Sequence, residues 1–317
     1  MEAALDAISV LRANPDQPDA LKQLKAAIGS RISVVASKAA KLAGELRKEE
    51  LVPDLVSAFE RFMKEPHKSD KGCRALIEIA TALYAMDYAG HEVYLKGIRH
   101  VQMEGAYGPP VDNAVPLRVV SALGLAQSRY PDRMEELVRL VADKELGARI
   151  GAVRAIASAG DPASPLLLRL KALIGDSEAE VFGECFLGLL MLAPAKSLPF
   201  VAAYLGGDEA VSEAAMLALG ATRRADAFEV LRQAWEKPLS TELRKTLLLS
   251  IATLRLQEAL DFLFSIITDG PQQAAADAIT ALGLYREDSK IRTAVETAVS
   301  SRCERPLMEA FRAAWSS

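Results

Sequence analysis

Small and large apolar residues alternate along the chain with a fixed period. A small residue returns every 30 to 33 positions, and Leu or Ile follows it each time. The small residues are Ala122, Ala155, Gly188, Ala218, Ser250 and Ala281. Further apolar or small residues lie three and seven positions before each of them, and these offsets trace one face of an α-helix. The pattern predicts one inward-facing helix in every repeat, which we call the first helix.

A second apolar stripe follows each first helix after a short turn. Its three columns are Pro165, Leu198, Phe228, Leu260 and Ile291, then Leu168, Val201, Leu231, Leu263 and Ala294, then Ala172, Leu205, Trp235, Ile267 and Ala298. Spacings of three and four between columns again describe a helix. Because isolated helices of three to four turns are marginal in water, each must bury its stripe against its partner and the next repeat. The sequence therefore predicts a solenoid of roughly nine helix pairs.

The period lengthens near the N-terminus. Ala82 lies 40 residues before Ala122, and loops at 65–72 and 102–116 carry the excess. Both loops follow a second helix, so we expect them on one edge of the stack, where repeat proteins often bind partners. The predicted organisation is a single solenoid over 1–317, with irregular repeats at 1–110, regular repeats at 111–303 and a capping helix at 304–317.

Composition and charge narrow the functional classes. Hydrophobic residues make up 50% of the chain and aromatic residues 6%, a balance that suits close helix packing and leaves no competing strand signal. The formal net charge of −4 argues against a general nucleic-acid binder. Three cysteines far apart in sequence favour a reducing compartment. With neither a secretory signal nor a bilayer-length apolar run in the sequence, we expect a cytoplasmic protein without membrane insertion.

Three segments carry a family resemblance: ALGLAQSRYPD at 122–132, AIASAGDPASP at 155–165 and ALGLYRED at 281–288. They resemble the HEAT repeat family, especially the short bacterial form also seen in phycobilin lyase-like proteins. The resemblance implies an all-α fold, a right-handed α-α superhelix of antiparallel helix pairs. It also implies a curved binding scaffold whose second helices line the concave side.

Catalytic motifs are sparse. HEAT-like deoxyhypusine hydroxylases bind two irons through repeated His-Glu dipeptides, whereas this chain contains only His91-Glu92, which we expect to begin a second helix. Nucleophile, phosphate-loop and dinucleotide motifs are absent from the sequence. We therefore predict no enzyme activity, cofactor, metal or small-molecule substrate. A phycobilin lyase-like enzyme stays open as an alternative, because periodicity does not reveal a small-molecule pocket.

A basic stretch from Lys22 to Lys48 supports a second alternative, a HEAT-like nucleic-acid-binding protein. Its architecture would be similar to that of HEAT-like alkylpurine DNA glycosylases, which need a basic groove. The candidate anion-binding residues are Lys22, Lys25, Arg31, Lys38 and Lys41. Acidic residues follow at once from Glu49, and lysine-rich helix faces are commonly just solvated. The stretch would bind nucleic acid only if its charges converge on one face.

The favoured function is a non-catalytic scaffold or adaptor that binds a protein partner on its concave face and inter-repeat loops. The candidate partner-binding residues are His67 and Tyr107 on the two long loops, with Tyr94 and Arg99 on the second helix between them. Tyr and Arg are enriched among the side chains that dominate binding energy at interfaces. The identity of the partner is not encoded in any motif of the sequence.

Overall fold

The computed structural model describes residues 1–105 and 108–315. Contacts between residues divide the chain into two compact units, Met1–Leu167 and Leu168–Ser317. Helix α11 (Ser164–Ile174) contains the boundary. Each unit is an all-α stack of antiparallel helix pairs, as predicted. A single solenoid over the whole of 1–317 stays a prediction.

The first unit contains five first helices, of which α1 is the first. Its longer helices are α1 (Glu2–Ala13), α2 (Ala20–Ile28), α3 (Ser33–Glu45), α4 (Val52–Met63), α6 (Arg74–Ala85), α7 (His91–Ile98), α8 (Val115–Gln127), α9 (Arg133–Val141) and α10 (Leu146–Ser158). Shorter elements are η1 (Glu49–Leu51), α5 (Pro66–Ser69) and η2 (Lys71–Cys73). A small hairpin of β1 (Met103–Glu104) and β2 (Val111–Asp112) corrects the expectation that no strand would form.

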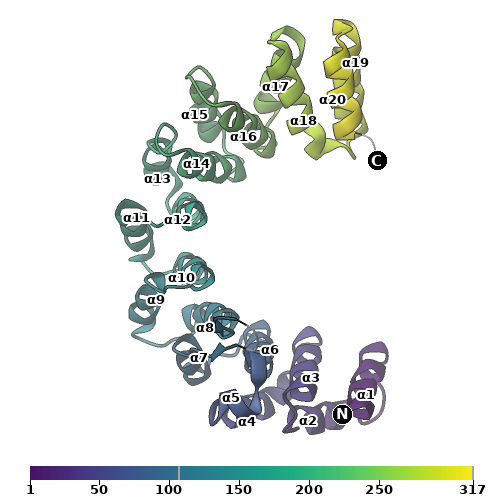
Figure 1. Cartoon of the computed structure of the whole chain (residues 1–317), viewed down its shortest axis with the longest axis vertical. Helices are drawn as coiled ribbons and strands as arrows, with labels where there is room; N and C mark the ends of the chain where they lie inside the picture. Colours follow the sequence, from purple (N-terminus) through teal and green to yellow (C-terminus); the bar gives the residue numbers. More distant parts are fainter. Residues whose placement is uncertain (106–107, 316–317) are drawn as a thin grey trace. The chain divides into compact units, whose positions relative to one another are not determined.

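The second unit continues the same alternation. Its helices are α12 (Ala179–Leu192), α13 (Pro194–Ala202), α14 (Glu209–Ala221), α15 (Ala225–Trp235), α16 (Thr241–Thr253), α17 (Gln257–Asp269), α18 (Gln272–Leu282), α19 (Ser289–Arg302) and α20 (Arg305–Trp315), with η3 (Gly283–Tyr285) after α18. Apart from the one-turn α5, the α-helices of the described residues form nine consecutive pairs followed by α20 (Figure 1).

First helices pack directly on first helices within each unit. In the first unit α3, α6, α8 and α10 stack in order, and in the second α12, α14, α16, α18 and α20 do so. Second helices contact their counterparts in the next repeat less extensively. A stack whose repeats are closer on one side curves toward that side. First helices therefore lie on the inner side within each unit, which corrects the implication that second helices would line it.

Small residues make this close stacking possible. Ala122, Ala155, Ala218 and Ser250 are at most 2% exposed, as their column predicts. Gly220 shows how little room there is, because a Cβ built there would lie 2.5 Å from the carbonyl oxygen of Ser250 on α16. At such contacts even one added methyl group would force the helices apart.

The predicted register fails in one place. Ala294 is exposed and Ala298 half-buried, whereas the neighbouring Val295 and Val299 are buried in α19. The buried face of α19 is thus shifted by one residue toward the C-terminus relative to the predicted columns. The larger valines gain more free energy from burial than alanines do. Beyond it, Trp315 of α20 is 1% exposed, and its indole N–H donates to the carbonyl oxygen of Ile279. Helix α20 packs on α18.

Several turns between first and second helices contain a residue with left-handed backbone. These residues are Arg47, Asp87, Arg223 and Arg255, with φ between 47° and 56°. After α3, the N–H of Lys48 returns to the carbonyl oxygen of Ala43, which completes a Schellman turn. Glycine is the usual residue at this position, since it adopts positive φ without steric conflict.

Candidate partner-binding surface

The two long loops of the first unit meet. Between α4 and α6 the chain forms α5 and η2, and between α7 and α8 it forms the β1–β2 hairpin. The N–H of Gly72 donates to Glu104 Oε2 (2.8 Å), and Gln102 Nε2 donates to the carbonyl oxygen of Asp70 (2.8 Å). We call residues 65–73, 99–105 and 108–113 the loop platform. Their contact agrees with the expectation that both loops emerge on one edge.

Asp70 anchors the first loop from below. Its carboxylate is fully buried and accepts hydrogen bonds from the backbone N–H groups of Ala75 and Leu76, both at 2.9 Å. These bonds satisfy free donors at the start of α6. Burial raises the pKa of Asp70 despite these bonds. The neighbouring Cys73 is also buried, and burial raises its pKa to about 12, so its thiol stays protonated at neutral pH.

Glu104 joins the two loops. Its carboxylate accepts from Gln102 Nε2 (2.7 Å) and from Asn113 Nδ2 (2.9 Å) as well as from Gly72. Burial opposes its ionisation, but these hydrogen bonds and the nearby His67 outweigh burial and lower the pKa of Glu104. The ionised carboxylate therefore holds the platform together at neutral pH.

Arg118 anchors the second loop to α8. Its side chain is 2% exposed, with Nη1 lying 2.7 Å from Asp112 Oδ2 and Nε 3.1 Å from Asp143 Oδ2. Arg118 Nη1 also donates to the carbonyl oxygen of His100 (2.8 Å). Asp112 in turn accepts from the N–H groups of Gln102 and Ala114. This buried polar network fixes the position of the loop relative to the helices.

Apolar side chains are exposed on both faces of the β1–β2 hairpin, because Met103 lies opposite Asp112 and Val111 lies opposite Glu104. Val101, Met103 and Val111 are 46%, 40% and 64% exposed. Val101 and Met103 flank Gln102, which is fully buried, and Val111 lies on β2. The platform is thus held from beneath by polar side chains and presents aliphatic ones to solvent.

His67 and Arg99 line different hollows beside these apolar residues. A hollow of about 550 Å³ is lined by His67, Lys71, Met103, Glu104, Gly105 and Asn113. A second, of about 350 Å³, is lined by Ile98, Arg99, Val101, Arg118, Glu136, Arg139, Leu140 and Asp143. Both predicted residues are exposed on the platform, but the structure does not bring them together.

Arg99 is held in place by Glu136 of α9. Its Nε lies 3.0 Å from Oε2 and its Nη2 2.6 Å from Oε1, a bidentate pair. Arg139 contacts the same carboxylate at 2.8 Å. The hydrogen bonds from Arg99 lower the pKa of Glu136. This pairing presents Arg99 in one orientation, with 57% of its side chain exposed.

Tyr94 does not lie on this surface. It is fully buried, and its ring packs where a Cβ at Gly124 of α8 would otherwise lie, 2.4 Å from its ring carbons. The prediction that Tyr94 contacts a partner is therefore wrong: the tyrosine fills the space that Gly124 leaves between α7 and α8. The remaining candidate, Tyr107, lies outside the described residues.

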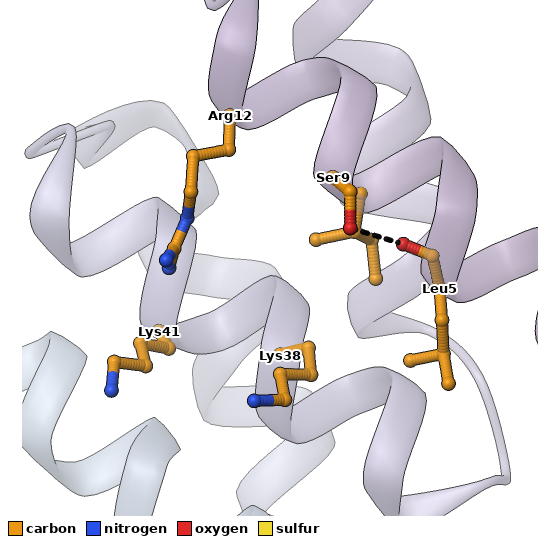
Figure 2. Close-up of a pocket in the computed structure, with 6 residues that line it drawn as sticks. Leu5, Ser9, Arg12, Lys38 and Lys41 are labelled. Atoms are coloured by element: carbon orange, nitrogen blue, oxygen red, sulfur yellow. Dashed lines mark hydrogen bonds between the residues drawn. The ribbon is translucent and has the colours of Figure 1, made fainter.

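The basic stretch is divided between two helices and the turn that joins them. Lys22 and Lys25 lie on α2, Arg31 precedes α3, and Lys38 and Lys41 lie on α3. Lys25 pairs with Asp54 at 3.2 Å. Figure 2 shows Lys38 and Lys41 opposite Arg12 and Ser9 of α1, around a hollow of about 260 Å³. Arg12 is itself paired with Glu45 (2.8 Å), which offsets part of the positive charge there.

Comparisons with known proteins add little to this geometry. The chain matches no family model and no curated protein. Human deoxyhypusine hydroxylase, solved in complex with glycerol, is 17% identical with a TM-score of 0.31, over 80% of this chain and 90% of that one. An engineered protein is 18% identical with a TM-score of 0.39, over 100% of this chain and 95% of that one. Scores this low carry no argument about function.

The helical-repeat character therefore rests on the helices themselves, and membership of the HEAT repeat family stays a prediction. His91 begins α7, as expected, and its ring stacks on Tyr130 with centroids 5.0 Å apart. Within residues 1–105 and 108–315, no cluster of three or more His, Cys, Asp or Glu is arranged to hold a metal ion. No helix in that part of the chain is both long and apolar enough to span a membrane.

Sequence reasoning missed the residues that build the loop platform. Asp70, Gln102, Asp112 and Arg118 are all buried polar side chains. Only Arg118 leaves a visible signal, since it interrupts the apolar run at 117–120 on a first helix. A charged residue in such a run indicates a buried partner of opposite charge.

Proposed function

We propose that this chain is a non-catalytic scaffold that binds a protein partner through the loop platform. The observation that supports this is the exposure of Val101, Met103 and Val111 on loops held by buried hydrogen bonds. Neighbouring apolar side chains exposed on a surface are typical of interaction sites. Loops that are already ordered lose less conformational entropy on binding than mobile ones do.

The surroundings favour a partner with an apolar centre and an acidic rim. His67, Lys71 and Arg99 are exposed around the aliphatic residues, and the bidentate Arg99–Glu136 pair limits the motion of the guanidinium. Positive groups at the edge of an interface accelerate association with an acidic partner and select against basic ones.

The test is quantitative affinity capture from native extract, followed by mass spectrometry. The double variant Met103→Glu/Val111→Glu places charge on both faces of the hairpin, at its two exposed apolar positions. Val10→Glu is the matched control, because Val10 is 52% exposed on α1 of the same unit. At least one protein should be captured by both the parent and the control. We expect the captured amount of that protein to fall about tenfold or more with the double variant, a loss of roughly 1.4 kcal/mol in binding free energy.

Arg99→Ala should weaken capture of the same protein by a smaller factor. Thermal melts of all variants establish that they are folded. Equal capture of every protein by the parent and by Met103→Glu/Val111→Glu would contradict the proposal.

A further inference from the structure

A groove in the second unit lies between the first helices α12 and α14. It encloses about 620 Å³. Its floor is made of small side chains: a Cβ at Gly183 would lie 3.6 Å from the Cβ of Ala214, so neither residue fills the space between the helices. Leu187 and Leu217 line it further along, and Leu217 is 43% exposed. We call this the α12–α14 groove.

One end of the groove is acidic. Glu178, Glu180 and Glu213 line it near the N-terminal ends of the two helices. The helix dipole accounts for a carboxylate in the first turn, such as Glu180, but its effect fades before Glu213. Glu213 accepts a hydrogen bond from Thr246 (3.2 Å), and within the described residues neither Glu180 nor Glu213 has an ion-pair partner.

The other end is aliphatic and continues past the groove. Met191 lies one turn beyond Leu187 on α12 and is 79% exposed. Leu249 of α16 occupies the repeat position of Leu187 and Leu217 and is 37% exposed. Three successive first helices of this unit therefore present a leucine at the same register. Solvent exposure of such a row is unfavourable unless something covers it.

We infer that the α12–α14 groove binds an amphipathic helix of another protein, with Lys or Arg at one end and aliphatic side chains at the other. A groove between two helices accepts the side-chain ridge of a third helix. The unpaired carboxylates select a basic end, and the leucine row selects an aliphatic one. Nucleic acid is disfavoured there because its phosphates would face the carboxylates.

The test uses the full chain and a displayed library of 16-residue helical peptides. The peptides share a leucine face, and their other positions vary among Lys, Glu, Gln and Ala. We expect selected peptides to concentrate Lys at one end. For the best peptide, measured by fluorescence anisotropy, Glu180→Gln/Glu213→Gln should weaken binding about tenfold or more, and Leu217→Gln should weaken it similarly.

Glu258→Gln/Glu296→Gln is the matched control, because it removes the same charge from exposed positions on α17 and α19. It should leave binding within about twofold of the parent. Selection without a charge bias, or an equal loss with the control pair, would overturn the inference. The inference would also be overturned if no peptide is selected, or if Leu217→Gln binds every selected peptide as tightly as the parent does.

The inference does not rest on the proposed function, because the groove uses no residue of the loop platform. Variants of the platform and of the groove can therefore fail independently. The Met103→Glu/Val111→Glu protein should bind the selected peptide as the parent does.

Discussion

The repeats around α6–α8 and those around α14–α16 solve the same stacking problem with different chemistry. Between α14 and α16, Gly220 lies against the backbone of Ser250, and apolar and small side chains fill the junction. Beside α6 and α8, buried Asp70 accepts from an N–H group at the start of α6, while Asp112 and Arg118 satisfy backbone groups of the long second loop. In this chain the long insertions are thus held by buried polar side chains, whereas the α14–α16 junction is packed by small and apolar ones.

The largest expected effect is that of Arg118→Ala, which tests whether the buried polar network stabilises the loops. Removing the guanidinium leaves Asp112 and Asp143 without their buried cation, so the free energy of unfolding should fall by about 3 to 5 kcal/mol. Chemical denaturation measures it, with Arg129→Ala, exposed just past α8, as the control. A loss below about 1 kcal/mol would show that the network is not what holds this region.

The apolar junction is tested by a matched pair of glycines. Gly220→Ala should lower the free energy of unfolding by about 1 to 3 kcal/mol, because the new methyl group meets backbone that cannot move aside. Gly183→Ala meets only an ordinary contact at 3.6 Å, and should raise stability by about 0.5 to 1 kcal/mol through helix propensity. Urea titration of both variants checks the signs. Equal effects would mean that spacing between first helices does not limit packing.

A smaller, pH-dependent effect should distinguish the loop platform. Glu104→Gln weakens the hydrogen bonds that join the loops, and should lower the free energy of unfolding at pH 7 by about 1 kcal/mol. Because the folded pKa of Glu104 is lowered, its contribution is complete above the ordinary glutamate pKa of about 4.3. It is lost as pH falls through the lowered value.

The parent should therefore lose more stability than Glu104→Gln between pH 5 and pH 3, roughly the range that spans an ordinary glutamate pKa. Urea midpoints across this range provide the measurement. Glu135→Gln, an exposed position on α9, serves as the control and should parallel the parent. Parallel acid profiles for the parent and Glu104→Gln would show that the carboxylate does not hold the loops.

The repeat columns predict the helices because each column reflects a requirement repeated along the stack. Ala155 and Ser250 had to be small wherever first helices touch, and both are fully buried. Cys185, three positions before Gly188, follows the same rule: it is fully buried, and burial raises its pKa to about 12. The column pattern failed at Ala294, because the neighbouring Val295 is larger and gains more from burial.

The loop platform was only partly predictable. Loop length indicated that 65–72 and 102–116 would emerge on one edge, but the hydrogen bonds that join them involve residues such as Gln102, which has no periodic counterpart. Tyr94 was misplaced because a tyrosine on a second helix has the same sequence signature whether it points outward or fills the space beside Gly124. The α12–α14 groove depends on which small residues face each other across the two helices, and the sequence alone does not show this pairing.

The left-handed turns after the first helices affect the stability of each unit, because non-glycine residues there carry backbone strain. Arg47 and Asp87 form an ion pair at 2.6 Å, and glycine at either turn would remove this pair. Arg223 and Arg255 have no ion-pair partner within the described residues, so their strained backbone is not offset in that way. Glycine at these two turns would relieve the strain and stabilise the second unit, while leaving every residue of the groove unchanged. Substitution at these two turns could thus change the stability of the second unit without altering the residues that line the groove.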